Sequence, residues 1–320
     1  MKHSIIQIKN ESGEPVTAQA PIIISASRAT DIPAFYADWF FYRLEKGYVK
    51  WHNPFNGMDH YISFHNTRFV VFWTKNPKPL LPYLNKLKSQ GIGFYIQYTL
   101  NNYEQEYLEP NLPSLKHRID TFKRFIDIYG KDCLVWRFDP LILTQNIGID
   151  RLLEKVSQIG DILYDFTDKL VFSFADIMTY KKVEVNLNRH GVKYKEWTQT
   201  EMTEFAAKLS ELNKRRWNYE LATCSESINL DKYDIKHNRC IDPLLISQRA
   251  PNDIILQNYL TTVKQDNGQR KSCGCIISKD IGQYGTCPHL CCYCYANSHP
   301  DKVLLNYSKY KSNPFLESII

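Results

Sequence analysis

The chain has 320 residues, of which 43% are hydrophobic and 13% aromatic, so it can form one large α/β domain or such a domain with a small appendage. No segment approaches the roughly 20 apolar residues of a membrane span, and the N-terminal residues lack the charged-then-apolar layout of a signal peptide, so we expect a cytoplasmic protein. The net charge of +6 is mild and spread along the chain, which indicates a solvated surface and leaves contact with nucleic acid or anionic substrates open.

Short apolar runs with the composition of β-strands alternate with longer amphipathic segments. The first strand is expected over 21–26, and a helix follows it over 34–45. A hairpin is expected between 49 and 64, around the turn-like residues 53–57. The remaining strands are expected over 69–73, 93–98, 133–137, 169–173 and 219–223, with helices ending near 89 and spanning 112–129, 149–166 and 198–212.

Six strands that alternate with helices predict a parallel sheet joined by right-handed crossovers. Several of these strands are apolar on both faces, as expected when helices cover the sheet. We therefore expect an α/β fold with a partial or open (β/α) barrel of six core strands, and a doubly wound open sheet is the alternative. After about residue 228 Asn, Asp, Gly and Cys become frequent, so a barrel-like domain over 1–228 is expected to carry a loop-rich, cysteine-rich, metal-binding cap over 229–320.

Polar side chains follow the predicted strands, at the ends where ligands bind in barrels and open α/β sheets. A ring of such residues with charges of both signs is typical of a pocket lining. The candidates for catalysis are Arg28, Asp31, Lys75, Arg137 and Asp139, and the candidates for cofactor binding are Thr74, Asn76, Asn101 and Ser173. Asp31 could equally cap a helix, and Arg137 with Asp139 could be an internal ion pair.

A short cysteine motif near the C-terminus carries the strongest chemical signal. With Cys292 set aside, Cys287, Cys291 and Cys294 form C-x3-C-x2-C. Three thiolates on so short a loop can converge on one [4Fe–4S] cluster, and they leave one iron open to an exogenous ligand. Whether Cys292 is also a ligand stays open.

Structural zinc is the alternative reading of this segment. Cys273 and Cys275 could complete a tetrahedral set with two cysteines of the motif. Such a site would leave Cys294 surplus, and the x3-then-x2 spacing fits a cluster loop more closely. The sequence therefore favours iron–sulfur over zinc.

Two more cysteines, Cys224 and Cys240, follow the sixth predicted strand in polar surroundings. With Cys273 and Cys275 they could form a closed, all-cysteine site for a second cluster or for zinc. Buried free cysteines, a redox pair and a catalytic thiol are the other readings. Nine cysteines, six of them between 273 and 294, suit a reducing cytoplasm better than a disulfide framework.

Several motifs together make the sequence resemble a bacterial family called domain of unknown function 1848. The motifs are ISASRATDIP (24–33), FWTKNP (72–77), WRFDP (136–140), CGC (273–275), SKDIGQY (278–284) and CPHLCCYCYAN (287–297). The resemblance covers nearly the whole chain. It implies no activity, because none is assigned to the family.

More remotely, Thr74-Lys75, Arg137-x-Asp139-Pro140 and the cysteine loop resemble spore photoproduct lyase and related radical S-adenosylmethionine proteins. This resemblance implies S-adenosylmethionine on the open iron, an electron donor for the cluster, and a small-molecule or nucleic-acid substrate. The cysteine loop follows the last predicted strand here, whereas those enzymes usually carry it after the first strand. A C-terminal loop could still fold over the same mouth of a barrel.

Overall fold

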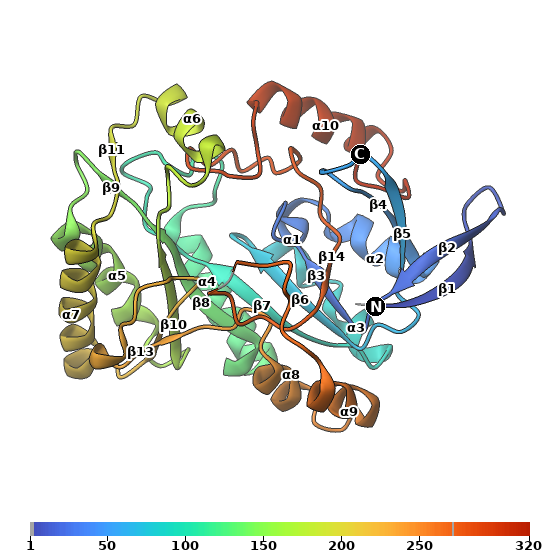
Figure 1. Ribbon diagram of the computed structural model, residues 1–320, viewed down its shortest axis with the longest axis horizontal. Coiled ribbons are helices and arrows are strands. Elements are labelled where there is room, and N and C mark those ends of the chain that lie inside the picture. Colours follow the sequence, from blue (N-terminus) through green and yellow to red (C-terminus); the bar gives the residue numbers. More distant parts are fainter. Residues whose placement is uncertain (1–2, 271) are drawn as a thin grey trace.

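The computed structural model describes residues 3–270 and 272–320 and has a mixed α/β fold around a large sheet (Figure 1). The sheet has eight strands in the order β13-β12-β10-β8-β7-β6-β3-β14. Every neighbouring pair in it is parallel. The strands are β3 (Ile23–Ala26), β6 (Phe69–Thr74), β7 (Gly93–Thr99), β8 (Leu134–Leu141), β10 (Lys169–Phe174), β12 (Glu220–Thr223), β13 (Ile235–His237) and β14 (Lys279–Asp280).

The six predicted core strands are confirmed, and they lie side by side in chain order. Two short strands, β13 and β14, were not predicted, and they form the two edges of the sheet. Because β13 and β14 do not pair within the described chain, no barrel is closed. The strand order also lacks the central reversal of a doubly wound sheet.

Helices pack on one face of the sheet, and the residues buried between them form one large apolar core. The sheet contributes Val70, Phe72, Ile96 and Trp136 to this core, which lie at alternating positions along their strands. The helices of the chain are α1 (Ile32–Phe35), α2 (Ala37–Lys46), α3 (Leu84–Ser89), α4 (Leu115–Tyr129), α5 (Ile149–Leu163), α6 (Lys181–Arg189), α7 (Gln199–Arg216), α8 (Pro243–Arg249), α9 (Ile254–Thr262) and α10 (Pro300–Ser312). Three-residue 3-10 helices span Lys78–Leu80, Lys131–Cys133 and Asp231–Tyr233.

The apolar spacing of the sequence explains how these helices dock. In α5 the side chains of Leu152, Val156, Ile159 and Leu163 are buried, and their spacing of four and three residues puts them on one face. Helix α7 begins with a capping box between Thr198 and Glu201. Helix α5 therefore buries one face in the core and leaves the opposite face exposed.

The C-terminal part of the chain covers the opposite face of the sheet. Phe69, Val71 and Tyr95 point to this face and pack with Ile246 of α8 and Leu256 of α9. The same apolar cluster includes the cysteines Cys240, Cys273 and Cys275. Segments that are far apart in the sequence are thus held against one sheet surface, and α8 and α9 lie together below the sheet in Figure 1.

A second, four-stranded sheet has the order β1-β2-β5-β4. The predicted hairpin is confirmed as the antiparallel pair of β4 (Tyr48–His52) and β5 (Asp59–Ser63). The hairpin of β1 (Ser4–Lys9) and β2 (Pro15–Ala20) was not predicted, and it projects from the body in Figure 1. A two-stranded pair joins β9 (Leu143–Thr144) to β11 (Tyr194–Lys195).

The segment after residue 228 was expected to be rich in loops. It contains α8, α9 and α10, and its strands β13 and β14 join the large sheet. The division into domains over 1–228 and 229–320 stays a prediction. Within the described chain, no helix combines the length and apolar character that crossing a membrane requires.

Candidate functional site

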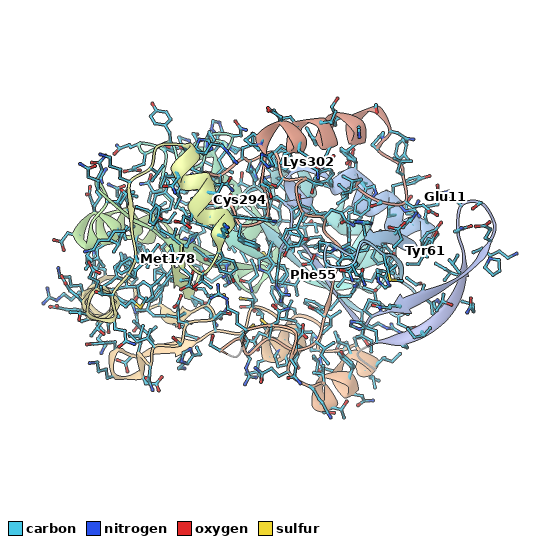
Figure 2. All side chains as sticks on the ribbon, turned by 45° about the horizontal axis from the view of Figure 1, so that its top comes forward. Glu11, Phe55, Tyr61, Met178, Cys294 and Lys302 are labelled. Atoms are coloured by element: carbon cyan, nitrogen blue, oxygen red, sulfur yellow. The ribbon has the colours of Figure 1, made fainter. Side chains whose placement is uncertain are left out.

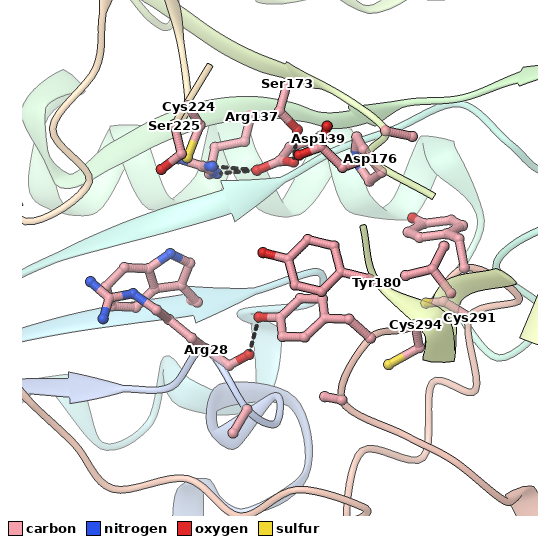
Figure 3. A pocket seen from close by; sticks show the side chains of 18 of the residues that line it. Arg28, Arg137, Asp139, Ser173, Asp176, Tyr180, Cys224, Ser225, Cys291 and Cys294 are labelled. Atoms are coloured by element: carbon pink, nitrogen blue, oxygen red, sulfur yellow. Dashed lines mark hydrogen bonds and ion pairs between the residues drawn. The ribbon is translucent and has the colours of Figure 1, made fainter. Parts of the chain in front are cut away.

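A cavity of about 490 Å³ lies at the carboxyl ends of β3, β6, β8, β10 and β12, and seven cysteines help to line it. They are Cys224, Cys240, Cys273, Cys275, Cys287, Cys291 and Cys294. Figure 3 shows Cys224 beside Arg137 and Asp139 on one side of this cavity, with Cys291 and Cys294 on another. Cys292 points elsewhere, and its thiol donates to the backbone oxygen of Tyr107 at 3.5 Å. Every cysteine predicted to bind metal thus reaches one cavity.

The loop that carries Cys287, Cys291 and Cys294 is tied to distant parts of the chain. Nε2 of His289 lies 2.9 Å from Oδ2 of Asp31, which follows β3. Asn186 of α6 donates to the backbone oxygen of Cys294 at 2.8 Å, and Cys294 is labelled in Figure 2. These contacts fix the loop over the strand ends.

The three thiols of this loop lie in a poorly solvated environment. Burial raises the pKa values of Cys287, Cys291 and Cys294. The ammonium group of Lys75 acts in the opposite direction on the pKa values of Cys291 and Cys294. Without a metal these groups are neutral thiols at neutral pH, and binding a metal would release their protons.

Lys75 belongs to a buried polar network beside the loop. Its Nζ lies 2.7 Å from Oε1 of Glu109 and 2.9 Å from the hydroxyl of Tyr293. Asn101 donates to the same hydroxyl at 3.1 Å. Burial alone would lower the pKa of Lys75, but the Glu109 carboxylate raises it above its ordinary value. The network therefore keeps one positive charge next to Cys291.

Arg137 and Asp139 form an ion pair at the end of β8, as one of the two readings of the sequence predicted. Nε of Arg137 donates to Oδ2 of Asp139 at 3.1 Å, and the Ser173 hydroxyl donates to the other carboxylate oxygen. Burial would raise the pKa of Asp139, but Arg137 and Ser173 hold it below its ordinary value. All three residues line the cavity.

Nη1 of Arg137 also donates to Sγ of Cys240 at 3.1 Å, and Sγ of Cys240 lies 3.4 Å from Sγ of Cys224. A hydrogen bond from the Cys275 thiol, together with Ser225, lowers the pKa of Cys273 to about 6 despite partial burial. The side chains of Cys224, Cys240, Cys273 and Cys275 therefore lie close together, and their role as metal ligands stays a prediction.

Arg28 lies in the same cavity with its guanidinium over the indole ring of Trp73, 4.9 Å from the ring centroid. Its backbone N–H donates to Oδ2 of Asp280 at 2.8 Å, which attaches the end of β3 to β14. Thr74 lines the cavity as well. Two other predicted residues do not line it. The amide of Asn101 contributes to the buried network, and Asn76 forms a turn with Thr74.

Sequence reasoning missed Glu109, His289 and Tyr293 as residues of the site, and it assigned no role to Glu226. Glu226 lines the cavity and accepts a hydrogen bond from the backbone N–H of Phe174 at 2.9 Å. Burial raises the pKa of Glu226 to about 8, so this carboxyl group is largely protonated at neutral pH. The positions of His289 and Tyr293 inside the cysteine motif are the only sequence signals that could have pointed to them.

Side chains that can bind metal do not converge on a single point in the part of the chain that the structure describes. Among residues 3–270 and 272–320, no group of three or more His, Cys, Asp or Glu side chains is arranged so that it could hold a metal ion. The seven cysteines share the cavity without forming such a group.

The chain belongs to the family of domain of unknown function DUF1848, whose model matches residues 23–296. No curated protein matches the chain. A solved structure from Bacteroides thetaiotaomicron, described as a "putative alpha-L-fucosidase", shares 10% identity and covers 61% of this chain and 85% of its own, with a TM-score of 0.23. A similarity this low carries no argument about function.

Proposed function

We propose that this DUF1848 protein is an iron–sulfur enzyme that holds a [4Fe–4S] cluster on Cys287, Cys291 and Cys294. The observation that carries the proposal is that these three thiols line the same cavity as the polar residues at the strand ends. Three cysteines are one ligand short of the four irons, so one iron would stay open toward the cavity. The thiolates of a four-iron cluster stand further apart than those of one ion, so the proposal does not require a single-ion geometry.

The order of the strands suggests the fold that carries this site. Counted along the chain, β13 and β14 are the seventh and eighth parallel strands, and β14 pairs with the first. We propose that the sheet is a (β/α) barrel opened between its last two strands. In such folds the ligand lies at the carboxyl ends of the strands, which is where the cavity is.

The side chains around the loop have distinct roles in this proposal. Lys75 would offset negative charge on the cluster beside Cys291, and Asp31 with His289 would hold the loop in place. Arg28, Asp139 and Thr74 would bind the polar parts of a ligand. A cavity of about 490 Å³ is in the size range of small-molecule sites, which supports a small-molecule substrate.

The remote resemblance to radical S-adenosylmethionine proteins suggests that S-adenosylmethionine is the ligand of the open iron. When bound, the cluster would supply single electrons for the cleavage of this cofactor. The chain would exclude water, orient the cofactor and the substrate, and offer Glu226 as a proton carrier. A one-electron donor and a reducing cytoplasm are then required.

The test is anaerobic reconstitution with iron and sulfide, followed by an assay for 5′-deoxyadenosine with a strong reductant. We expect brown protein that forms this product, and a Cys291→Ser variant that binds less iron than the wild type and forms no product. Cys292→Ser is the matched control, because the neighbouring thiol points away from the cavity, and it should keep its iron. A Cys291→Ser variant that binds as much iron as the wild type would contradict the cluster site.

Structural zinc on Cys273, Cys275, Cys287 and Cys291 is the second candidate, because four thiolates suffice for tetrahedral zinc. These thiols would have to move together, since they do not form a single-ion group in the described structure. Elemental analysis separates the two. About one zinc per chain without visible absorbance would favour zinc.

A further inference from the structure

The cavity contains a second set of sulfur atoms that the proposed cluster does not use. Cys224 follows β12, Cys240 follows β13, and Cys273 and Cys275 precede β14. Sγ of Cys224 lies 3.4 Å from Sγ of Cys240, and the Cys275 thiol is hydrogen-bonded to the side chains of both Cys240 and Cys273. The four sulfurs therefore form a continuous row along the cavity.

The elements that carry this row are firmly packed. Cys240, Cys273 and Cys275 are buried against the sheet face formed by Phe69 and Val71. The backbone N–H of Ile241 donates to Sγ of Cys275 at 3.4 Å, which links the segment after β13 to the segment before β14. The segments that carry the sulfur atoms are thus held together before any ligand binds. The side chains would turn apart to admit a cluster, whose thiolates stand further apart than the 3.4 Å between Cys224 and Cys240.

Two arginines, the buried Arg137 and the half-buried Arg28, face the same row. Nη1 of Arg137 donates to Sγ of Cys240 at 3.1 Å, and Arg28 lies close enough to Cys275, Cys240 and Cys273 to interact with them electrostatically. In the described chain, no side-chain oxygen accepts a hydrogen bond from the Arg28 guanidinium, which lies over Trp73. Burying a positive charge is costly unless negative charge lies nearby. Asp139 supplies such charge for Arg137 and Asp280 supplies it for Arg28, and thiolates on a metal centre beside the two guanidinium groups would add to it.

Ordinary core cysteines have a different environment in this chain. Cys133 is buried beneath α4, where its thiol donates to the backbone oxygen of Phe125 at 3.6 Å, and it does not line the cavity. Apolar packing explains Cys133. It does not explain four sulfurs in a row beside two guanidinium groups.

We propose that Cys224, Cys240, Cys273 and Cys275 bind a second iron–sulfur cluster, with Arg28 and Arg137 balancing its charge. All four ligands come from the chain, so this cluster has no open iron and does not bind substrate. The inference does not rest on the proposed function, because the two sites share no cysteine.

The test compares three variants after anaerobic reconstitution with iron and sulfide. The first combines Cys287→Ser, Cys291→Ser and Cys294→Ser, the second combines Cys224→Ser and Cys240→Ser, and the third is the matched control Cys133→Ser. The first and second variants should each keep about half of the iron and sulfide of the wild type, because each keeps one cluster. The control should keep all of it. The reduced first variant should show the electron paramagnetic resonance signal of one cluster.

Each outcome separates the two sites. A first variant without iron, together with a second variant that keeps all of it, overturns the four-cysteine site and leaves the proposed function standing. A first variant that keeps all of the iron, together with a second that keeps none, overturns the proposed cluster on Cys287, Cys291 and Cys294 and supports the four-cysteine site. Zinc in place of iron in the first variant overturns the assignment of an iron–sulfur cluster. The first variant retains all four cysteines in question, so its metal content decides the matter even if the second does not fold.

Discussion

Nη1 of Arg137 lies 3.1 Å from Sγ of Cys240, so a buried guanidinium on β8 donates a hydrogen bond to the thiol that follows β13. The same arginine pairs with Asp139 and donates to Oε1 of Gln97 at 3.1 Å. One side chain therefore joins the strand-end ion pair to the row of cysteines. The positive charge beside Cys240 therefore comes from a side chain of the sheet.

Replacing Arg137 by Met should destabilise the protein by about 2–4 kcal/mol, because it leaves Asp139 without its partner. The cost is lower than for a fully buried pair, because the Asp139 side chain is 24% exposed and water can partly solvate its charge. Urea unfolding measures the change. Lys116→Met is the control, because its pair with Asp120 is exposed, and it should change stability by less than about 0.5 kcal/mol. Equal effects of the two substitutions would show that the Arg137 pair is not buried as described.

Replacing Asp31 by Ala should release the cysteine loop. The Asp31 carboxylate accepts hydrogen bonds from the backbone N–H groups of Ala34 and Lys75 at 3.0 and 2.8 Å and contacts His289 at 2.9 Å. Losing three partly buried contacts should cost about 2–3 kcal/mol, and Asp31→Asn should cost less because it keeps one accepting oxygen. Native-state labelling of Cys287 with a thiol reagent is the second readout. We expect faster labelling in Asp31→Ala, and unchanged labelling would contradict the role of Asp31 as an anchor.

A methyl group at Gly282 should disturb the contact between β3 and the segment that leads to the cysteine loop. An added Cβ would lie 1.8 Å from Oγ of Ser27, which donates to Asp280 at 2.8 Å. Gly282→Ala should therefore lower stability by about 1–3 kcal/mol, as expected for overpacking. Gly148→Ala is the control, since its Cβ would meet no atom within 4 Å. Thermal unfolding of the two variants should differ clearly, and identical midpoints would contradict this close approach.

The start of α7 should make stability depend on pH at acidic values. Lys195 and Thr198 lower the pKa of Glu201 from 4.5 to about 2. Because the pKa is lower in the folded state, the stabilisation is fully present above about pH 4.5 and is lost as the pH falls toward 2. Glu201→Gln should therefore be less stable than the wild type at pH 6, by about 1 kcal/mol for a capping contact that is partly exposed. The difference should shrink as the pH falls below 4.5, and a difference that does not change with pH would refute this assignment.

The sequence predicted the six central strands because apolar residues on both faces of a covered strand leave a strong pattern. It did not predict β14, which consists of the polar pair Lys279 and Asp280 and is a strand only because β3 lies beside it. It also missed α9, in which Ile254 and Ile255 are exposed, so that no amphipathic stripe marks the helix. Strand β14 and helix α9 form because of the segments they pair with or pack against, and not because of a local sequence pattern.

In the site, too, some residues could be predicted from the sequence and others depend on tertiary packing. The rule that ligands lie at the ends of parallel strands pointed to Arg28, Asp31 and Lys75, and all three line one cavity. Glu109 is not at the end of a strand, and it reaches Lys75 only through the path of its loop. Because a loop's course depends on tertiary packing, no local pattern could predict this contact.

The most direct test of the central claim is elemental analysis of the wild-type protein purified without oxygen. The cysteine-lined cavity predicts several irons per chain with an equal amount of acid-labile sulfide, and a brown solution. Protein that contains about one zinc, no iron and no visible absorbance would contradict an iron–sulfur site at the strand ends.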